Sequence, residues 1–260
     1  MKVSKFYPLL LVICAAISVS AQKGYDKPMD KWSQGEALKI VSESPWAKTY
    51  QSTRGAAGAA QFQVGREQSQ SVYGGGSNPR SVARYFGPPP VVMRLHSSEM
   101  LRKATVRLQQ IDAGYDKMSA DDKAKFDNSR KGFLDCAICK DYYVVTLTKF
   151  KEVNSQTVEE GIFQNMTLAE LKGNIHLVND NGEKRELIQF TPPKGPADST
   201  LFFFKRNNDS GQPLVTPDTK EVRFVMANTF LDAKNRFAYL LPRSFDFKVS
   251  QMMVGDKVLF

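Results

Sequence analysis

Hydrophobic and polar residues alternate through most of the C-terminal half of the chain, which is the pattern of half-buried β-strands. The clearest hairpin joins residues 174–178 to residues 184–190 through Asp180-Asn181-Gly182, because Asn-Gly adopts the positive φ angles of a tight turn. The C-terminal body is therefore predicted to be an antiparallel β-sheet or a small β-sandwich. Further strands are predicted at residues 91–95, 142–148, 200–205, 220–226, 236–241, 244–249 and 257–260.

Large apolar side chains on these strands are predicted to form the hydrophobic core of the sheet. Burying one of them contributes roughly 1.5–3 kcal/mol. A disulfide that closes a very short loop contributes little, because loop entropy grows with loop length. Stability is therefore expected to come from the sheet. The predicted core residues are Leu201, Phe203, Val222, Phe224, Phe237, Tyr239, Phe245 and Phe247.

Apolar residues recur at helical spacing in the N-terminal half, where three helices are predicted. The first covers residues 30–44, where Ser33 and Glu36 form a capping box. The third runs from residue 119 to about residue 131 on the surface and ends at Gly132. A second capping box, Thr167-Leu168-Ala169-Glu170, predicts one short helix later in the chain.

The second helix begins at Ser97 or Ser98 and has two distinct faces. Its basic face is expected to meet solvent, while its apolar stripe packs on the rest of the protein. The basic face holds Arg102, Lys103, Arg107 and Gln110, and the stripe holds Met100, Leu101, Ala104, Leu108 and Ile111.

These patterns together indicate an α+β protein with its helices in the N-terminal part. The composition divides the chain into a signal peptide at residues 1–21, a capped helix at 22–50, a flexible loop at 51–87 and an α+β domain at 88–260. The loop is rich in Gly, Ala, Gln and Ser. It is predicted to be flexible because few of its side chains can bury enough area to offset chain entropy.

The first residues of the chain are typical of a secretory signal. Lys2 and Lys5 precede an apolar run of about a dozen residues, and small residues lead to a cleavage site after Ala21. Cys14 raises a lipoprotein alternative, but Ile13 stands where lipid-attachment signals need a small residue. The processed chain is predicted to be periplasmic or secreted, and it contains no second long apolar run that could cross a membrane.

The charge of the chain is moderately positive. Its 36 Lys and Arg against 27 Asp and Glu make +9, which becomes +7 when Lys2 and Lys5 leave with the signal. The basic residues are spread along the chain, so a solvated surface is the favoured interpretation. An envelope component or an anionic surface is the partner that this charge would suit, and nothing in the sequence indicates a nucleic acid.

Cys136 and Cys139 are the two cysteines that remain after signal cleavage, and they are the candidate site. Exported thiols usually oxidise, so a local disulfide that braces the turn before strand 142–148 is the favoured interpretation. A redox-active Cys-x-x-Cys is the first alternative. Redox motifs of this kind open a helix, whereas this pair leads into a strand pattern, which counts against redox activity.

Two cofactor alternatives remain for the same pair. Covalent haem attachment normally needs Cys-x-x-Cys-His, and Lys140 stands in the place of the histidine. Zinc would need Cys136, Cys139, His96 and His176, but the two histidines lack paired spacing. The sequence therefore predicts no cofactor.

The N-terminal part of the chain contains Lys31-Trp32, Glu36-Ala37-Leu38 and Ser44-Pro45-Trp46-Ala47-Lys48. These three groups resemble the N-terminal part of an uncharacterised family of exported proteins from soil bacteria. The resemblance continues weakly at 89–95, 201–204, 220–224 and 245–260. It implies export and a β-rich C-terminal half, and it supplies no activity or catalytic residue.

No nucleophile elbow, His-Glu-x-x-His helix or dinucleotide-binding glycine pattern occurs in the sequence. Adjacent carboxylates at Asp121-Asp122 and Glu159-Glu160 point in different directions, so neither pair suggests a matched acid and base. We therefore expect an exported, non-catalytic binding or scaffolding protein of the cell envelope. The alternative is a thiol–disulfide or metal-dependent activity at Cys136 and Cys139.

Overall fold

The computed structural model describes residue 25 and residues 27–51, 90–149, 163–195, 198–227, 241–254 and 257–260. Some predicted features fall on other residues and lie outside the described part. These are the signal peptide at 1–21 with Cys14, all but the first residue of the 51–87 loop, and most of the 236–241 strand with Phe237 and Tyr239.

Eight antiparallel strands form one sheet, which confirms the predicted α+β class. Their order across the sheet is β1-β2-β3-β6-β5-β4-β7-β8. A two-stranded ladder, β9 (Met253–Val254) with β10 (Lys257–Val258), stands apart. The strands of the large sheet are β1 (Ala47–Tyr50), β2 (Val91–Leu95), β3 (Tyr142–Lys149), β4 (Ile175–Asn179), β5 (Lys184–Thr191), β6 (Thr200–Lys205), β7 (Glu221–Met226) and β8 (Ser244–Lys248).

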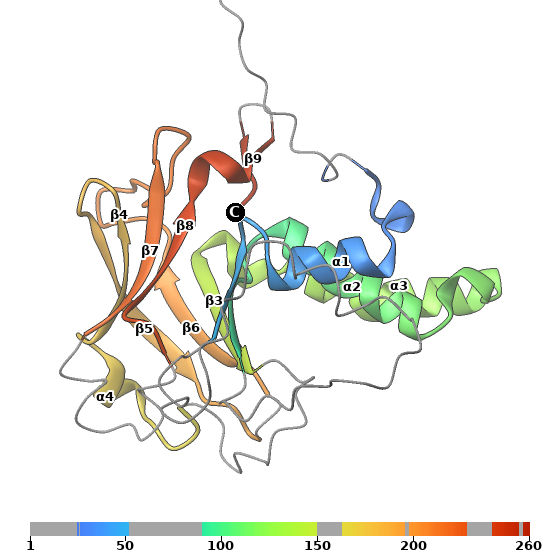
Figure 1. Ribbon diagram of the computed structural model, residues 1–260, viewed down its shortest axis with the longest axis horizontal. Helices are drawn as coiled ribbons and strands as arrows, with labels where there is room; N and C mark the ends of the chain where they lie inside the picture. The colour runs from blue at the N-terminus through green and yellow to red at the C-terminus, as the bar shows by residue number, and fades with distance from the viewer. Residues whose placement is uncertain are drawn as a thin grey trace, which may run out of the picture.

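The sheet curls almost into a barrel, as Figure 1 shows. Its two outermost strands approach each other. The ring centroids of Tyr50 on β1 and Phe245 on β8 lie 6.3 Å apart in an edge-on contact. The predicted hairpin joins β4 to β5, and Gly182 has a φ of 82° in its turn. Asn-Gly thus acts as its sequence predicts.

The aromatic core fills one side of this curled sheet. Phe202 and Phe204 are fully buried there, and the ring of Phe202 lies 5.1 Å from that of Phe224. Four predicted core residues, Val222, Phe224, Phe245 and Phe247, are confirmed as members of this cluster.

Of the other two described core predictions, Phe203 is confirmed as buried, whereas Leu201 is only half-buried. Both belong to the opposite side of the sheet, where Phe203 is buried in a smaller cluster and Leu201 is half-buried. The run from Thr200 to Lys205 is apolar on both faces. Simple alternation therefore could not define which face meets the main core.

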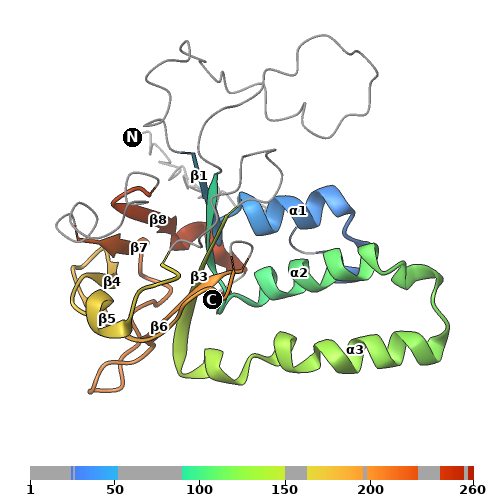
Figure 2. The same ribbon diagram turned by 90° about the horizontal axis from the view of Figure 1, so that it is seen from below.

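Three helices gather beside one end of the sheet, and α2 lies between α1 and α3 (Figure 2). The capping box of Ser33 and Glu36 starts α1, and that of Thr167 and Glu170 starts the short helix α4, so both predicted boxes are confirmed. The helices are α1 (Gln34–Ser42), α2 (Glu99–Asp112), α3 (Ala120–Asp135) and α4 (Leu168–Leu171), and the single turns are η1 (Met29–Lys31), η3 (Tyr115–Lys117), η4 (Ala137–Lys140) and η6 (Val249–Met252).

The prediction that the basic face of α2 meets solvent was wrong. Arg102 and Arg107 are each only 6% exposed, and Gln110 is 3% exposed. The reason is the position of α2 between two helices, which encloses both faces. The guanidinium of Arg107 donates to the Trp32 carbonyl just before α1, and that of Arg102 donates to the Leu134 carbonyl near the end of α3.

The predicted end of α3 at Gly132 was also wrong. The helix continues to Asp135, and Cys136 closes it in a left-handed conformation with a φ of 40°. The amide of Cys136 donates to the Gly132 carbonyl at 3.0 Å. The residue that ends the helix is therefore Cys136 and not Gly132, although a glycine adopts the left-handed conformation at lower cost. No residue of α3 is buried, as expected for a surface helix.

Candidate functional site

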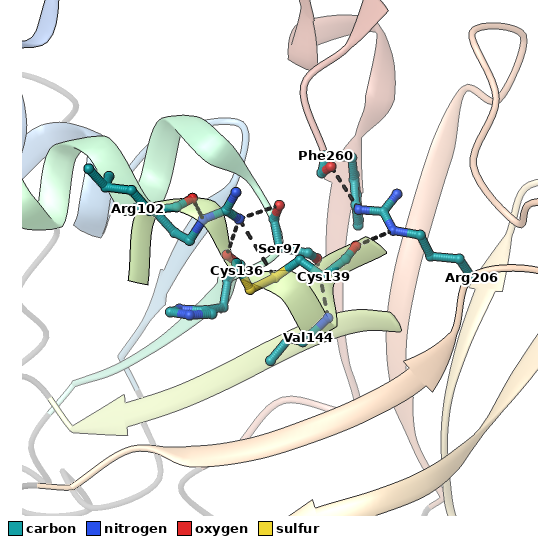
Figure 3. The surroundings of a disulfide bond; sticks show 9 residues. Ser97, Arg102, Cys136, Cys139, Val144, Arg206 and Phe260 are labelled. Carbon is teal, nitrogen blue, oxygen red and sulfur yellow. Dashed lines mark hydrogen bonds between the residues drawn. A yellow bond between two sulfur atoms is a disulfide. The ribbon is translucent and has the colours of Figure 1, made fainter. Parts of the chain in front are cut away.

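A disulfide joins Cys136 to Cys139 at the junction between α3 and β3 (Figure 3). Its Cα atoms are 5.3 Å apart, and the turn η4 lies between the two residues. Cys136 ends α3, and β3 begins at Tyr142, so the bond braces the turn before the strand. The pair lies at the end of a helix, whereas redox motifs usually stand at the start of one.

The disulfide covers a small hydrophobic cluster on the side of the sheet opposite the main core. Val144 on β3 and Phe203 on β6 form its buried base, with exposed fractions of 1% and 6%. Tyr142, Ile188 and Leu201 surround this base and are half-buried. The bond thus packs against apolar side chains on the face that it turns towards the sheet.

Arg102 approaches the disulfide from α2. Its Nη1 donates to the carbonyls of His96 at 3.1 Å and Ser97 at 2.7 Å, and it lies 3.7 Å from Sγ of Cys139. Its Nε donates to the Leu134 carbonyl at 2.9 Å. Burial lowers the pKa of Arg102. One guanidinium therefore ties the end of β2, the end of α3 and the second cysteine together (Figure 3).

Arg206 approaches the same turn from the other side, just after β6. Its Nε donates to the Cys139 carbonyl at 2.7 Å, and its Nη2 donates to the Phe260 carbonyl at 2.8 Å. The guanidinium also lies over the Tyr143 ring, 4.7 Å from the centroid. Burial raises the pKa of Tyr143, whose hydroxyl accepts from the Val215 amide at 3.1 Å.

Ser97 completes the ring of polar groups around the turn. Its amide donates to the Val144 carbonyl and its hydroxyl accepts from the Val144 amide, both at 3.2 Å. Ser97 thereby fastens the segment between β2 and α2 to the middle of the hydrophobic cluster. Sequence reasoning placed Ser97 only as a helix cap, because its contact with β3 depends on a distant part of the chain.

The two histidines proposed as zinc ligands lie far apart in the sheet. His96 directly follows β2, and His176 is on β4, with β3, β6 and β5 between those strands. Burial, followed by the charges of Arg102 and Arg94, lowers the pKa of His96 to about 4. Among the described residues, no three His, Cys, Asp or Glu side chains are grouped to hold a metal ion. The structure therefore does not bring the four proposed ligands together.

The carboxylate pair Asp121-Asp122 has a structural position. Both residues stand in the first turn of α3, where the Asp122 amide donates to the Ser119 hydroxyl at 3.2 Å. This is an ordinary helix N-terminus, where acidic side chains suit the helix dipole. Glu159-Glu160 lies outside the described residues.

One exposed apolar side chain marks the outer surface of the disulfide turn. Ile138 is 40% exposed and stands between the two cysteines, and it is the large apolar residue that the described ranges leave most open to solvent. Ala137 and Lys140 on the same turn are exposed as well. The turn thus presents an apolar tip on a cross-linked, hydrogen-bonded base.

The fold and site define an α+β protein with a curled antiparallel sheet and a disulfide-braced turn at its helical end. The chain matches no protein-family model, no curated protein and no solved structure. Within the ranges described above, every helix is too short or too polar to cross a bilayer.

Proposed function

We propose that this chain is an exported, non-catalytic binding or scaffolding protein of the cell envelope. The observation that carries the proposal is that the two guanidinium groups beside the disulfide donate to backbone carbonyls. Arg102 donates to three backbone carbonyls and Arg206 donates to two. Backbone carbonyls take three of the five N–H donors of Arg102 and two of those of Arg206, which is a structural use of both side chains that holds the turn in place.

Export is supported by the signal pattern at residues 1–21 and by the disulfide, because such bonds persist in oxidising compartments. The resemblance to exported soil-bacterial proteins points the same way. We expect the processed protein to begin at Gln22. N-terminal sequencing of protein from the periplasmic or culture fraction tests this, and an intact N-terminus on a cytoplasmic protein would contradict it.

The binding surface that we propose is the tip of the disulfide turn. Ile138 supplies an exposed apolar side chain, and the half-buried Tyr142, Ile188 and Leu201 belong to the cluster under the same turn. Apolar side chains held on a rigid base lose little entropy when they bind. We assign this surface to an apolar segment of an envelope protein.

A photo-crosslinking residue at position 138 tests the binding role in the intact cell. We expect one discrete adduct with an envelope protein after irradiation, and its loss when an unlabelled excess of the wild-type protein is present. The matched control is the same residue at Asn128, which is exposed on α3. Equal adducts at both positions, or none at 138, would reject the proposed surface.

A second candidate function is thiol–disulfide exchange at Cys136 and Cys139. It is favoured by one observation, the guanidinium of Arg102 at 3.7 Å from Sγ of Cys139. Counting thiols in protein isolated without reductant separates the two functions. A fully oxidised, unreactive pair supports the binding role, and a substantial reduced fraction supports exchange.

A further inference from the structure

The two cysteines of the disulfide have different electrostatic surroundings. Cys136 stands at the C-terminal end of the 16-residue helix α3, where the helix dipole disfavours a negative charge. Sγ of Cys139 lies 3.7 Å from Nη1 of Arg102, and a guanidinium at that position favours a thiolate. The pair is therefore asymmetric in a way that the sequence motif alone does not show.

The charge of Arg102 is held in place and is not neutralised by a contacting carboxylate in the described part of the chain. Its hydrogen bonds go to carbonyl oxygens and to the sulfur. Glu99 and Asp135 affect its pKa only through space, against the larger effect of burial. A thiolate at Cys139 would be the nearest full negative charge to this guanidinium.

Other charged groups near Cys139 act in both directions. Arg206 adds a second guanidinium, bonded to the Cys139 carbonyl, and Lys140 follows directly in the chain. Asp135 and Asp141 flank the turn in sequence and oppose it. His96 has a pKa of about 4, so it is neutral near pH 7 and does not contribute charge there.

We propose that the reduced pair is a site of thiol–disulfide exchange in which Cys139 is the nucleophile and Arg102 is the positioning residue that stabilises its thiolate. The substrate class is a disulfide-bonded polypeptide whose apolar flank contacts Ile138. In Cys-x-x-Cys motifs at a helix N-terminus, the helix dipole stabilises the thiolate of the first cysteine. Here the stabilised thiolate belongs to the second cysteine. The inference rests on the second candidate function, and it replaces the non-catalytic role if it holds.

The exchange conserves atoms and electrons in two steps. The Cys139 thiolate attacks one sulfur of the substrate disulfide, which forms a mixed disulfide and releases the other substrate sulfur as a thiolate. Cys136 then loses its proton to solvent and attacks Sγ of Cys139. This step restores the Cys136–Cys139 bond and releases the second substrate thiolate. The substrate disulfide gains two electrons from the protein, and a dithiol reductant must return two electrons to the protein.

The test is the pH dependence of alkylation of each cysteine in the reduced full chain. Iodoacetamide is added at pH values from 5 to 10, roughly the range that spans thiol ionisation. Tryptic cleavage leaves both cysteines in the peptide 132–140, and fragmentation in the mass spectrometer separates them. We expect the Cys139 profile to have its midpoint at least about one pH unit below that of Cys136.

Variants of α2 identify the source of the asymmetry. Arg102→Met should move the Cys139 midpoint up towards the ordinary thiol value of about 8.5, and Arg102→Lys should restore most of the shift. Lys103→Met is the matched control, because it removes a positive charge from the neighbouring, half-exposed position. It should leave both midpoints unchanged.

Three results would overturn the inference. The first is equal midpoints for the two thiols in the reduced wild-type chain. The second is a lower midpoint for Cys136. The third is a reduced chain whose thiols both react as fast as in denaturant, which would mean that no folded dithiol site exists. If Arg102→Met fails to fold, the wild-type midpoints still decide whether Cys139 is the more acidic thiol and therefore the nucleophile.

Discussion

At the scale of single residues, buried arginines hold the helical layer together through backbone carbonyls. Arg107 shows the effect most clearly, because its Nε donates to the Trp32 carbonyl at 2.9 Å. Its side chain is 8% exposed, whereas that of its ion-pair partner Asp116 is 69% exposed. We expect Arg107→Met to lower the free energy of unfolding by about 2 kcal/mol, since a buried carbonyl loses its donor. Urea denaturation measures the loss.

Asp116→Asn is the control for that prediction. An exposed ion pair contributes little, so this change should cost less than about 1 kcal/mol. Equal losses for the two variants would show that the ion pair, and not the carbonyl contact, carries the stabilisation.

His96 makes stability depend on pH through a single imidazole. Its folded-state pKa of about 4 lies below the ordinary value of 6.5, so the folded protein disfavours the protonated ring. Stability from this group is therefore fully present above pH 6.5 and is lost as the pH falls towards 4. Between pH 7.5 and pH 5 the expected loss is about 2 kcal/mol.

The control for the pH prediction is His96→Phe. This variant should show a much flatter stability profile over the same interval, measured by denaturant unfolding at each pH. Glu36 is another strongly shifted group, with its pKa lowered to about 2 by Lys27 and Ser33, and its effect on stability falls at lower pH. An unchanged profile in His96→Phe would assign the pH dependence to other groups.

At the scale of elements, two glycines distinguish the effect of helix propensity on stability from the effect of a positive φ angle. Gly132 lies inside α3 without a positive φ, and a Cβ added to it would meet no atom within 4 Å. We expect Gly132→Ala to raise the free energy of unfolding by about 0.5–1 kcal/mol. Gly182→Ala is the matched control, because the site is equally open but has a φ of 82°. It should lower stability, and thermal unfolding distinguishes the two signs.

The disulfide is predicted to stabilise a junction and not the whole fold. Replacing Cys136 and Cys139 with alanine should leave the protein folded and cost about 2 kcal/mol or less, because the closed loop is short. Hydrogen exchange should accelerate at the end of α3 and in η4, and remain slow in the centres of β3 and β6. Loss of the whole fold would contradict the view that the sheet carries stability.

The elements that the sequence predicted correctly are those with local causes. Ser33 and Glu36, or the Asn-Gly of the β4–β5 turn, act on atoms a few residues away, so their effect is visible in the sequence. The burial of Arg102 and the facing of Phe203 depend on elements far along the chain. The candidate site followed the same division: its cysteines were predicted from the sequence, whereas Arg102 and Arg206 were not.

At the scale of the whole molecule, the helical layer and the sheet share one core. The main cluster extends from Trp32 and Ala37 beside the helices to Phe224 and Phe247 in the sheet. The curl that brings Tyr50 towards Phe245 has no local signal in the sequence, because it joins strands from opposite ends of the chain. A continuous core of this kind should unfold cooperatively.

Phe224→Ala tests this cooperativity with two independent probes. The ring of Phe224 is fully buried and contacts Phe202 and Phe204, so its removal should cost roughly 3–5 kcal/mol. The protein has two tryptophans, and both are buried. Trp32 lies beside the helices, where its carbonyl accepts from Arg107, and Trp46 directly precedes β1, where its carbonyl accepts from the Leu95 amide of β2. Their fluorescence therefore reports the helices together with the β1–β2 edge of the sheet, while circular dichroism reports the secondary structure of the whole protein.

The variant should shift both transitions to the same lower denaturant concentration, because loss of sheet packing destabilises the tryptophan environment through the shared core. Phe203→Ala is the matched control on the other side of the same sheet, in the small cluster under the disulfide. It should produce a smaller shift, again equal for both probes. If fluorescence kept its wild-type midpoint in Phe224→Ala while circular dichroism shifted, the helices with the β1–β2 edge and the rest of the sheet would be separate cooperative units, and the single-core interpretation would be wrong.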